Sequence, residues 1–278
     1  MELNWAEVER IIESALREDA PGGDITTNLL FDREERAAAL FRAKSPGVLA
    51  GLPVAERVFR KLDPTCTFTA SIQDGQPVAA GTVLAEVGTT RRALLTGERV
   101  ALNLMQRMSG IATLTAQYVE AVRGLPVKIL DTRKTAPGLR VLDKYAVRMG
   151  GATNHRLTLS DLAMVKDNHI RLAGGIWPAV RKIRTLAPAG LRIEVECAQL
   201  DQVREALEAG ADIIMLDNMP TSLMHEAVTL VAKRAQVEAS GNIGLANVRD
   251  VAETGVDFIS VGKLTHSPAA LDISMKVI

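Results

Sequence analysis

The chain has 278 residues, of which 47% are hydrophobic and 24% charged, a balance typical of a soluble globular protein with one large or two ordinary domains. Lysine and arginine together number 33, as do aspartate and glutamate, so the bulk charge does not indicate nucleic acid or an acidic membrane as a partner. The two cysteines lie far apart in the sequence, and we find neither a membrane span nor a signal peptide, so we expect a cytoplasmic protein without disulfides.

The first 120 residues mix helical and strand-like patterns. Apolar side chains recur at helical spacing over residues 4–19, and the helix predicted there ends before the loop APGG. The runs GVLAGLPV, TFTASI and TVLAEV predict short strands, with a turn at the Asp-Gly pair between the last two. A long helix is then predicted from about Arg91 through Met108.

After about residue 120 one unit recurs, in which an amphipathic helix follows a short apolar strand with a polar end. The strands are predicted in VKILD, LAMVKD, LRIEVEC, ADIIMLDN, QVEASG and DFISVG. The helices are predicted in GLRVLDKYAVRM, IWPAVRKIRTLA, LDQVREALEAG, SLMHEAVTLVAKRA and LANVRDVAETG. Strict alternation indicates parallel strands with right-handed crossovers. Six units are too few for the standard eight-stranded barrel, so we predict an incomplete, open parallel α/β barrel. A doubly wound sheet is the alternative, weakened because no GxGxxG follows a strand.

Polar residues at the strand ends are the candidates for a functional site, because in α/β barrels the chemistry gathers where strands run into the following loops. In chain order these ends carry Asp131-Thr132-Arg133-Lys134, Lys166-Asp167-Asn168, Glu196, Asp217-Asn218, Ser240-Gly241-Asn242 and Gly262-Lys263. One such residue could simply cap a helix. Six consecutive ends of this kind predict a functional rim.

Four cations are expected at this rim. They are Arg133, Lys134, Lys166 and, just ahead of the second strand, Arg156. Adjacent cations at the end of a buried strand are unfavourable unless an anion meets them. Arginine can bind a carboxylate or phosphate through two parallel hydrogen bonds, whereas lysine supplies a point charge. The alternative is that they are surface charges paired with nearby acids, which suits Arg156 alone better than the set.

Two acids close adjacent strands. Glu196 and Asp217 could hold Mg²⁺ directly or through water, and Mg²⁺ commonly binds together with phosphates. They could equally stabilise a developing sugar cation. The alternative is that each caps the following helix, which suits Asp217 better than Glu196, since Glu196 lies inside the apolar run IEVEC.

Small residues and histidines supply the remaining candidates. Ser240, Gly241 and Gly262 would let backbone N–H groups approach a phosphate, although a tight turn needs the same residues. The run VGK lacks the spacing of a P-loop. None of the four histidines has metal-ligand spacing, but His155 and His266 could hydrogen-bond an anionic substrate.

The motifs resemble those of one enzyme family. DTRKTAPGLRVLDKYAVRMGGATNHRL, MVKDNHI, VEC, IIMLDNM, EASGNI and DFISVGKLTHSPAALDIS are similar, in this order, to the motifs of quinolinate phosphoribosyltransferases, also called nicotinate-nucleotide pyrophosphorylases (carboxylating). The resemblance covers nearly the whole chain. It implies an N-terminal α/β sandwich domain over residues 1–110, joined by the C-terminal residues 268–278, and an open-barrel catalytic domain over residues 111–267.

The resemblance also implies an activity and an assembly. In that family quinolinate and phosphoribosyl pyrophosphate give nicotinate mononucleotide, pyrophosphate and CO₂, with Mg²⁺, in de novo NAD synthesis. A homodimer is implied, in which the N-terminal domain of one subunit lies over the barrel of its partner.

Residue by residue, the resemblance implies a quinolinate site of Arg133, His155, Arg156 and Lys166, with Arg99 contributed across the dimer. It implies that the catalytic group around the phosphoribosyl pyrophosphate and the metal comprises Lys134, Glu196 and Asp217, with the two acids at the metal. It further implies a phosphate end that comprises Ser240, Gly241, Gly262 and His266, and Thr132, Asn242 and Lys263 complete the expected substrate-binding set. The family usually has alanine at the position of Lys263 and often GGG where this chain has GGA at residues 150–152.

Three rival functions share parts of this pattern. Lys166 on a barrel strand could form a Schiff base in an aldolase. A non-catalytic sensor of a pyridine dicarboxylate would need the cations but not Glu196 and Asp217. A nicotinate-specific transferase or a molybdenum-transport-associated relative would share the fold, and three arginines together favour a dicarboxylate over nicotinate.

Overall fold

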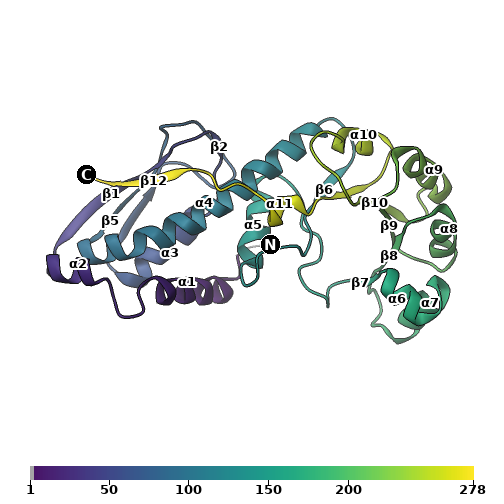
Figure 1. The fold of residues 1–278 in the computed structure, drawn as a ribbon, viewed down its shortest axis with the longest axis horizontal. Coiled ribbons are helices and arrows are strands. Elements are labelled where there is room, and N and C mark those ends of the chain that lie inside the picture. Colours follow the sequence, from purple (N-terminus) through teal and green to yellow (C-terminus); the bar gives the residue numbers. More distant parts are fainter. Residues whose placement is uncertain (1–2) are drawn as a thin grey trace. The chain divides into compact units, whose positions relative to one another are not determined.

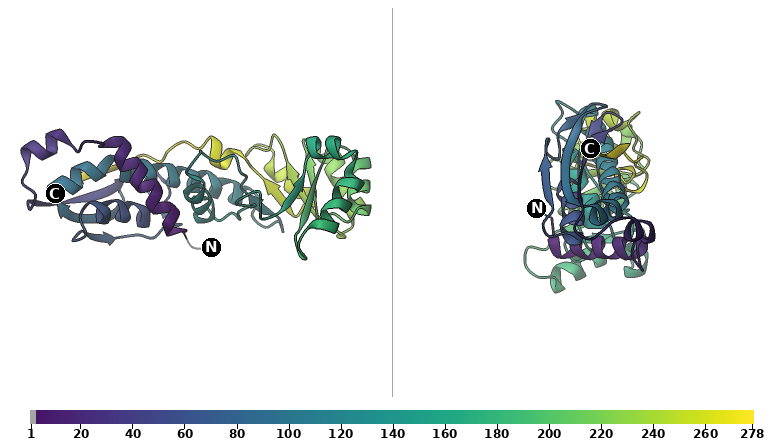
Figure 2. Two further views of the ribbon diagram at one scale, coloured as in Figure 1. Left: turned by 90° about the horizontal axis from the view of Figure 1, so that it is seen from below. Right: turned by 90° about the vertical axis from the view of Figure 1, so that its left-hand side faces the viewer.

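The computed structural model describes residues 3–278, and these form two compact units (Figures 1 and 2). The first unit comprises the chain up to Ala116, Thr135–Gly151 and Leu264–Ile278. The second comprises Gln117–Lys134 and Ala152–Lys263. Within residues 3–278, no helix combines the length and the apolar character that crossing a membrane requires.

The first unit is built on a four-stranded antiparallel sheet with the order β12-β1-β5-β3. Its strands are β1 (Arg36–Ala43), β3 (Thr67–Ala70), β5 (Val83–Thr90) and β12 (Ile273–Val277), and a separate pair joins β2 (Gly47–Val48) to β4 (Pro77–Val78). Its helices are α1 (Trp5–Asp19), α2 (Ile25–Leu30), α3 (Leu52–Leu62), most of α4 (Arg91–Ala121) and α5 (Arg140–Met149). Because Phe41 of β1 pairs with Met275 of β12, the last strand of the chain completes a sheet that begins near its start.

The core of the first unit lies between this sheet and α3 (Figure 1). Phe41 of β1 and Phe59 of α3 are both fully buried, and their rings meet edge to face with centroids 6.0 Å apart. The helix begins at Leu52 because Gly51, at φ 106°, can take the left-handed conformation that precedes it.

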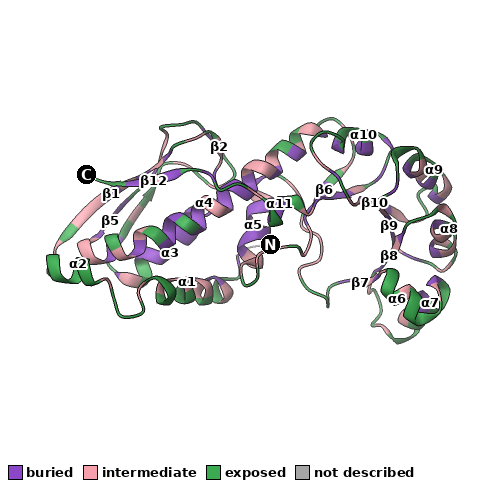
Figure 3. Ribbon diagram, viewed as in Figure 1, coloured by how far each residue is buried: buried purple, intermediate pink, exposed green. Residues whose placement is uncertain are grey.

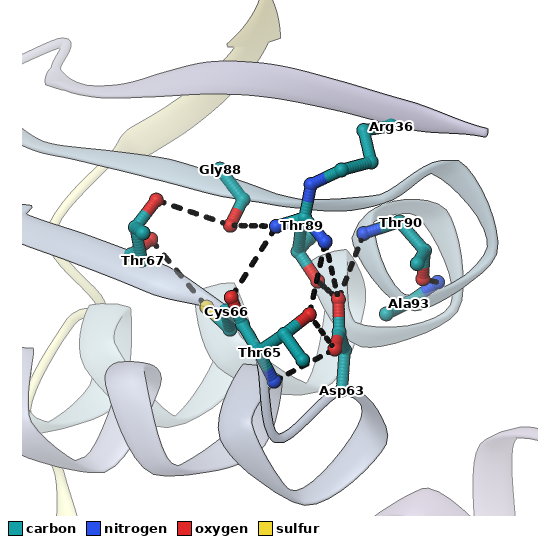
Figure 4. A network of polar contacts seen from close by, with 9 residues as sticks. All are labelled: Arg36, Asp63, Thr65, Cys66, Thr67, Gly88, Thr89, Thr90 and Ala93. Atoms are coloured by element: carbon teal, nitrogen blue, oxygen red, sulfur yellow. Dashed lines mark hydrogen bonds and ion pairs between the residues drawn. The ribbon is translucent and has the colours of Figure 1, made fainter. Parts of the chain in front are cut away.

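A buried carboxylate ties the end of α3 to β5 (Figure 4). Asp63 accepts hydrogen bonds from Thr89 Oγ1 at 2.8 Å, from the backbone N–H of Thr90 at 3.0 Å and from the backbone N–H of Thr65 at 2.9 Å. Burial alone would raise the pKa of Asp63, but the hydrogen bonds from Thr65 and Thr89 outweigh it and lower the pKa below its usual range. The network fixes the strand end from which α4 starts.

The helix α5 belongs to the first unit because two polar contacts hold it there. Arg107 of α4 binds the buried carboxylate of Asp143 through two hydrogen bonds, Nε to Oδ1 at 2.9 Å and Nη2 to Oδ2 at 2.8 Å. Tyr145 donates from its hydroxyl to Asp74 Oδ2 at 2.9 Å. These two contacts join α5 to α4 and to the loop after β3.

The second unit is a six-stranded parallel sheet with the order β6-β11-β10-β9-β8-β7. Its strands are β6 (Lys128–Leu130), β7 (Ala163–Val165), β8 (Ile193–Cys197), β9 (Ile213–Asp217), β10 (Gln236–Ser240) and β11 (Phe258–Ser260). The strands β6 and β7 are consecutive in the sequence but lie at opposite edges of the sheet. The sheet is therefore an open barrel, as predicted.

Helices follow the strands of the second unit and cover one face of the sheet. They are α6 (Asp167–Ala173), α7 (Ile176–Leu186), α8 (Leu200–Glu208), α9 (Thr221–Val231) and α10 (Val248–Glu253), and the short α11 (Lys263–His266) begins at the last residue of this unit. From α6 to α9 each helix packs against the next, and each presents an exposed face to solvent while the strands are buried (Figure 3). This burial explains why most residues of the strands are apolar.

The structure confirms the six barrel strands, the helices predicted between them and the long helix that starts at Arg91. The prediction of a strand throughout GVLAGLPV is wrong after Val48, since Leu52 already begins α3. The sequence patterns do not predict β1, whose run RAAALFRA has small residues and no clear alternation.

The two compact units differ in their limits from the predicted domains 1–110 and 111–267. The helix α4 continues through residue 110 without a break, and the boundary falls between Ala116 and Gln117. The segment around α5 joins the first unit through the contacts of Asp143 and Tyr145.

Candidate active site

Parallel pairing brings strand ends that are distant in the sequence to one edge of the second unit. Ser240, at the end of β10, pairs with Asp217 of β9 on one side and with Ser260 of β11 on the other. Ser260 in turn pairs with Leu130, the last residue of β6. The predicted rim is thus a continuous edge of the sheet.

An ion pair joins two of the predicted site residues at this edge. Val165 of β7 pairs with Val195 of β8, so Lys166 and Glu196 follow at the same level of the sheet. Lys166 Nζ lies 2.7 Å from Glu196 Oε2, and the side chain of Glu196 is only 16% exposed. The cationic and acidic groups predicted from the sequence therefore meet directly.

Two guanidinium groups form a concentration of positive charge. Arg133 Nε is buried and has no hydrogen-bond partner among the described residues, and Arg156 is held by a bond from Nη1 to Leu162 O at 3.1 Å. Burial lowers the pKa of Arg156 and the charge of Arg133 lowers it further, whereas Glu194 and Asp161 act in the opposite direction. A bound anion would stabilise this pair, because it would offset the repulsion between the two cations and accept a hydrogen bond from the buried Arg133 Nε.

A buried aspartate positions the loop that carries these groups. Asp131, directly after β6, accepts hydrogen bonds from Asn154 Nδ2 and from the backbone N–H of His155, both at 2.7 Å. Leu130 also forms an isolated parallel bridge with Thr153. The loop before β7 is thereby fixed beside the end of β6, which brings Arg156 close to Arg133.

A cluster of buried ionisable groups lies among the strands. His155 Nε2 is 3.3 Å from Glu194 Oε2 and 3.4 Å from Glu238 Oε2, and the two glutamate side chains are at most 1% exposed. Ser260 donates from its hydroxyl to Glu238 Oε1 at 2.5 Å. His155 is a predicted site residue, whereas neither glutamate was predicted from the sequence. Glu194 could have been predicted, because side chains two residues apart in a strand lie on the same face and Glu194 therefore shares the face of β8 with Glu196.

The contacts with the two buried glutamates favour the protonated form of His155. Burial lowers the pKa of His155, but the contacts with Glu194 and Glu238 outweigh it and raise the pKa to about 9. Burial raises the pKa of Glu194; His155 acts against this, and the charge of Glu238 adds to it. The backbone N–H of Arg156 lies 2.7 Å from His155 Nδ1, so the ring is oriented with Nε2 toward the two carboxylates.

We predict that His155 titrates near pH 9. A histidine whose pKa rises from 6.5 to about 9 on folding stabilises the fold fully below pH 6.5, and this contribution is lost as the pH rises through 9. A pKa difference of about 2.5 corresponds to about 3 kcal/mol at most. NMR titration of the histidine side chains measures the midpoint, and a midpoint at or below 6.5 would contradict the charged cluster. Glu238→Gln should lower the midpoint, whereas Ser260→Ala, which keeps both carboxylates, should change it less.

The two predicted metal residues each use one carboxylate oxygen on a neighbour. Glu196 Oε2 contacts Lys166, and Asp217 Oδ2 accepts a hydrogen bond from Asn218 Nδ2 at 2.9 Å. Glu196 Oε1 and Asp217 Oδ1 are then the oxygens that would face a cation. A pair of half-buried carboxylates on adjacent strands matches the oxygen ligands that Mg²⁺ takes in proteins.

The remaining predicted residues of the second unit lie along the same edge. Gly241 and Asn242 follow β10 with φ values of 94° and 52°, and Gly262 follows β11. Lys134 and Lys263 are exposed, and the backbone N–H of Lys134 donates to Thr132 Oγ1 at 3.0 Å.

Two predicted residues do not belong to this edge. Arg99 is exposed on α4 and His266 is exposed in α11, and both are part of the first unit.

Comparisons with known proteins agree with this architecture. Residues 24–109 match the N-terminal domain of quinolinate phosphoribosyl transferase, and residues 111–276 match the C-terminal domain. The chain belongs to the quinolinate phosphoribosyltransferase family. Its two matched segments correspond in order to the two domains that the motifs imply.

Several relatives and solved structures resemble this family member over its whole length. It is 49% identical to the probable nicotinate-nucleotide pyrophosphorylase [carboxylating] of a Synechocystis strain, over 99% of this chain and 94% of the relative. It is 43% identical to the protein of the same name from Bacillus subtilis, over 99% and 95% of the two chains. The crystal structure of NadC from Streptococcus pyogenes is 44% identical and superposes with a TM-score of 0.96, covering 100% of this chain and 99% of that one.

Proposed function

We propose that this member of the quinolinate phosphoribosyltransferase family transfers the phosphoribosyl group of phosphoribosyl pyrophosphate to quinolinate. The products are nicotinate mononucleotide, pyrophosphate and CO₂, and the reaction belongs to de novo NAD synthesis. The observation that carries the substrate is the meeting of Arg133 and Arg156, two partly buried cations whose charges repel and one of which has an unsatisfied buried donor. A flat dianion bound between them would offset the charge repulsion and accept a hydrogen bond from the unsatisfied donor.

The quinolinate subsite is proposed to comprise Arg133, Arg156 and Lys166, with His155 as a hydrogen-bonding neighbour and Thr132 beside them. The forked guanidinium groups suit the two adjacent carboxylates, and the ammonium of Lys166 adds a point charge. Lys166 Nζ is paired with Glu196 Oε2 at 2.7 Å, so a bound dianion would share the ammonium group with this carboxylate.

The donor subsite is proposed to comprise Lys134, Glu196 and Asp217. Glu196 and Asp217 would hold Mg²⁺, which when bound supplies positive charge to the diphosphate leaving group. The N–H groups and side chains at the phosphate end would bind the phosphates; within the second unit they belong to Ser240, Gly241, Asn242, Gly262 and Lys263. The left-handed backbone of Gly241 and Asn242 supports this, because such turns direct consecutive N–H groups toward an anion.

The chemistry follows from these charges. The pyridine nitrogen of quinolinate attacks the anomeric carbon while the bond to pyrophosphate breaks, and the ribose passes near an oxocarbenium ion. Lys134 neutralises the departing negative charge, and the carboxylates of Glu196 and Asp217 favour the sugar cation. The bond between the ring carbon and the adjacent carboxylate then breaks, and CO₂ leaves. The electron pair of that bond stays on the ring carbon, where the positive charge of the neighbouring pyridinium nitrogen stabilises it, and a proton from water takes the place of the carboxylate. No protein nucleophile is required, and the ion pair of Lys166 with Glu196 weighs against a Schiff-base aldolase, which needs a free amine.

We also propose a homodimer in which Arg99 completes the quinolinate subsite of the partner. An exposed arginine on α4, outside the unit that holds the strand ends, supports this arrangement because it is available to a second chain.

The decisive assay compares quinolinate with nicotinate. With Mg²⁺ and phosphoribosyl pyrophosphate, we expect release of CO₂ and formation of nicotinate mononucleotide from quinolinate, and no product from nicotinate, because the site provides cations for two carboxylates. An equal rate with nicotinate would overturn the substrate. Binding of quinolinate in a calorimeter without turnover would instead support a sensor, and borohydride trapping of a carbonyl substrate would support an aldolase.

A further inference from the structure

Asn218 has an unusual backbone for the position that it occupies. It follows Asp217 at the end of β9 and has φ 55°, in the left-handed region that few residues other than glycine adopt. Asparagine is among the residues that tolerate this conformation best. The turn places its short amide side chain directly beside the carboxylate of Asp217.

The amide of Asn218 is held at both ends. Its Nδ2 donates to Asp217 Oδ2 at 2.9 Å, and its Oδ1 accepts from Asn242 Nδ2 at 2.9 Å. Its backbone N–H donates to Ser240 O, also at 2.9 Å. The amide cannot rotate by half a turn without setting two NH₂ groups against each other, so the hydrogen bond to Asp217 has a fixed direction.

Gly241 completes this arrangement by leaving room for the amide. A Cβ atom on residue 241 would lie 2.4 Å from Asn218 Oδ1, 2.5 Å from Cγ and 2.7 Å from Nδ2. Glycine is also suited to the φ of 94° at this position. The side chain of Asn218 therefore lies against the backbone of the turn after β10, between the acid of β9 and that turn.

We propose that Asn218 is a positioning residue that orients the carboxylate of Asp217 toward the cation and the diphosphate of the donor. The inference rests on the donor subsite proposed above. Because Oδ2 is committed to the amide, Oδ1 is left to face a cation, and the carboxylate does not have to be ordered when the cation arrives. The chain of amides from Asn242 through Asn218 to Asp217 also links the metal residue to the turn proposed to bind phosphate.

The test replaces the amide and keeps the backbone. Asn218→Gly retains the left-handed conformation and removes the side chain, and Lys233→Gly, at another exposed position with φ 60°, is the matched control for added glycine. We expect Asn218→Gly to weaken Mn²⁺ binding about tenfold, measured by calorimetry with and without phosphoribosyl pyrophosphate. The KM for phosphoribosyl pyrophosphate should rise by a similar factor, while the KM for quinolinate stays within about twofold. Asp217→Asn is the reference for loss of the carboxylate.

A second variant keeps the test informative if the first perturbs the turn. Asn218→Ala removes the same two side-chain hydrogen bonds with a residue of different backbone preference and should weaken Mn²⁺ binding in the same direction, and the circular dichroism and melting temperature of each variant report on folding. Unchanged Mn²⁺ affinity and an unchanged KM for phosphoribosyl pyrophosphate in folded Asn218→Gly protein would overturn the inference. A wild-type protein that binds Mn²⁺ but does not turn over quinolinate would count against the proposed reaction and leave the role of Asn218 standing.

Discussion

Arg133→Ala should retain its fold and lose on the order of 10²–10³-fold in kcat/KM for quinolinate, since removal of one partner of a buried charged hydrogen bond costs about 2–5 kcal/mol. Arg133 has a buried Nε without a partner among the described residues, so its truncation removes no protein contact of that atom. Its charge also lowers the pKa of Arg156, and that repulsion disappears in the variant. The folded state should therefore be as stable as the wild type or slightly more so, and only the bound state should suffer.

Two further variants make the measurement specific. Arg133→Lys keeps the charge but not the planar fork, and should recover part of the loss. Arg181→Ala removes an exposed arginine on α7 and should leave the kinetics unchanged. Steady-state kinetics with each substrate varied in turn will locate the effect. A variant with normal KM for quinolinate and a raised KM for phosphoribosyl pyrophosphate would place Arg133 in the donor subsite and contradict the assignment.

Mixing two inactive variants should restore about one quarter of the wild-type activity if the site is shared across a symmetric dimer. Arg99→Ala removes the arginine that a chain contributes to the site of its partner. Arg133→Ala removes the arginine that a chain contributes to its own site. After random exchange about half of the dimers contain one chain of each kind, and one of their two sites has both arginines. The other site in the same dimer lacks both.

The exchange has to be demonstrated for this result to count. The variants are unfolded and refolded together, differently tagged, and the mixed dimers are purified and assayed against each variant refolded alone. Mixed dimers without activity would contradict the sharing of Arg99, and a monomer in sedimentation would contradict the dimer itself. Either result would leave the roles of Arg133 and Arg156 within one chain intact.

The barrel could be predicted from the sequence because its signals are local. Each strand is a short apolar run with a polar end, and its helix follows at once, so one segment at a time suffices. The pairing of Lys166 with Glu196 follows from the same rule, because parallel strands align their ends. The first strand of the other sheet was missed since RAAALFRA carries small side chains in place of the usual alternation.

The buried cluster could not be predicted in the same way. His155 and Glu238 are distant in the sequence, and their contact depends on how far the loop before β7 folds toward β10. A glutamate inside an apolar strand is an exception to the pattern, and only the structure shows that two such glutamates, Glu194 and Glu238, face the same histidine. The role of Asn218 was equally hidden, because its φ and the absence of a side chain at Gly241 are features of backbone conformation.

The pairing of β12 with β1 has a consequence for the order in which the first sheet forms. The two strands of this pair lie far apart in the sequence, so their contact closes a long loop, whereas each strand of the second unit from β7 to β11 lies close in sequence to a neighbour with which it pairs. We therefore expect the pairing with β12 to be a late step in folding. Until it forms, β1 presents an unpaired edge to which a strand of another molecule could add, and proline substitutions within β12 would prolong that exposure.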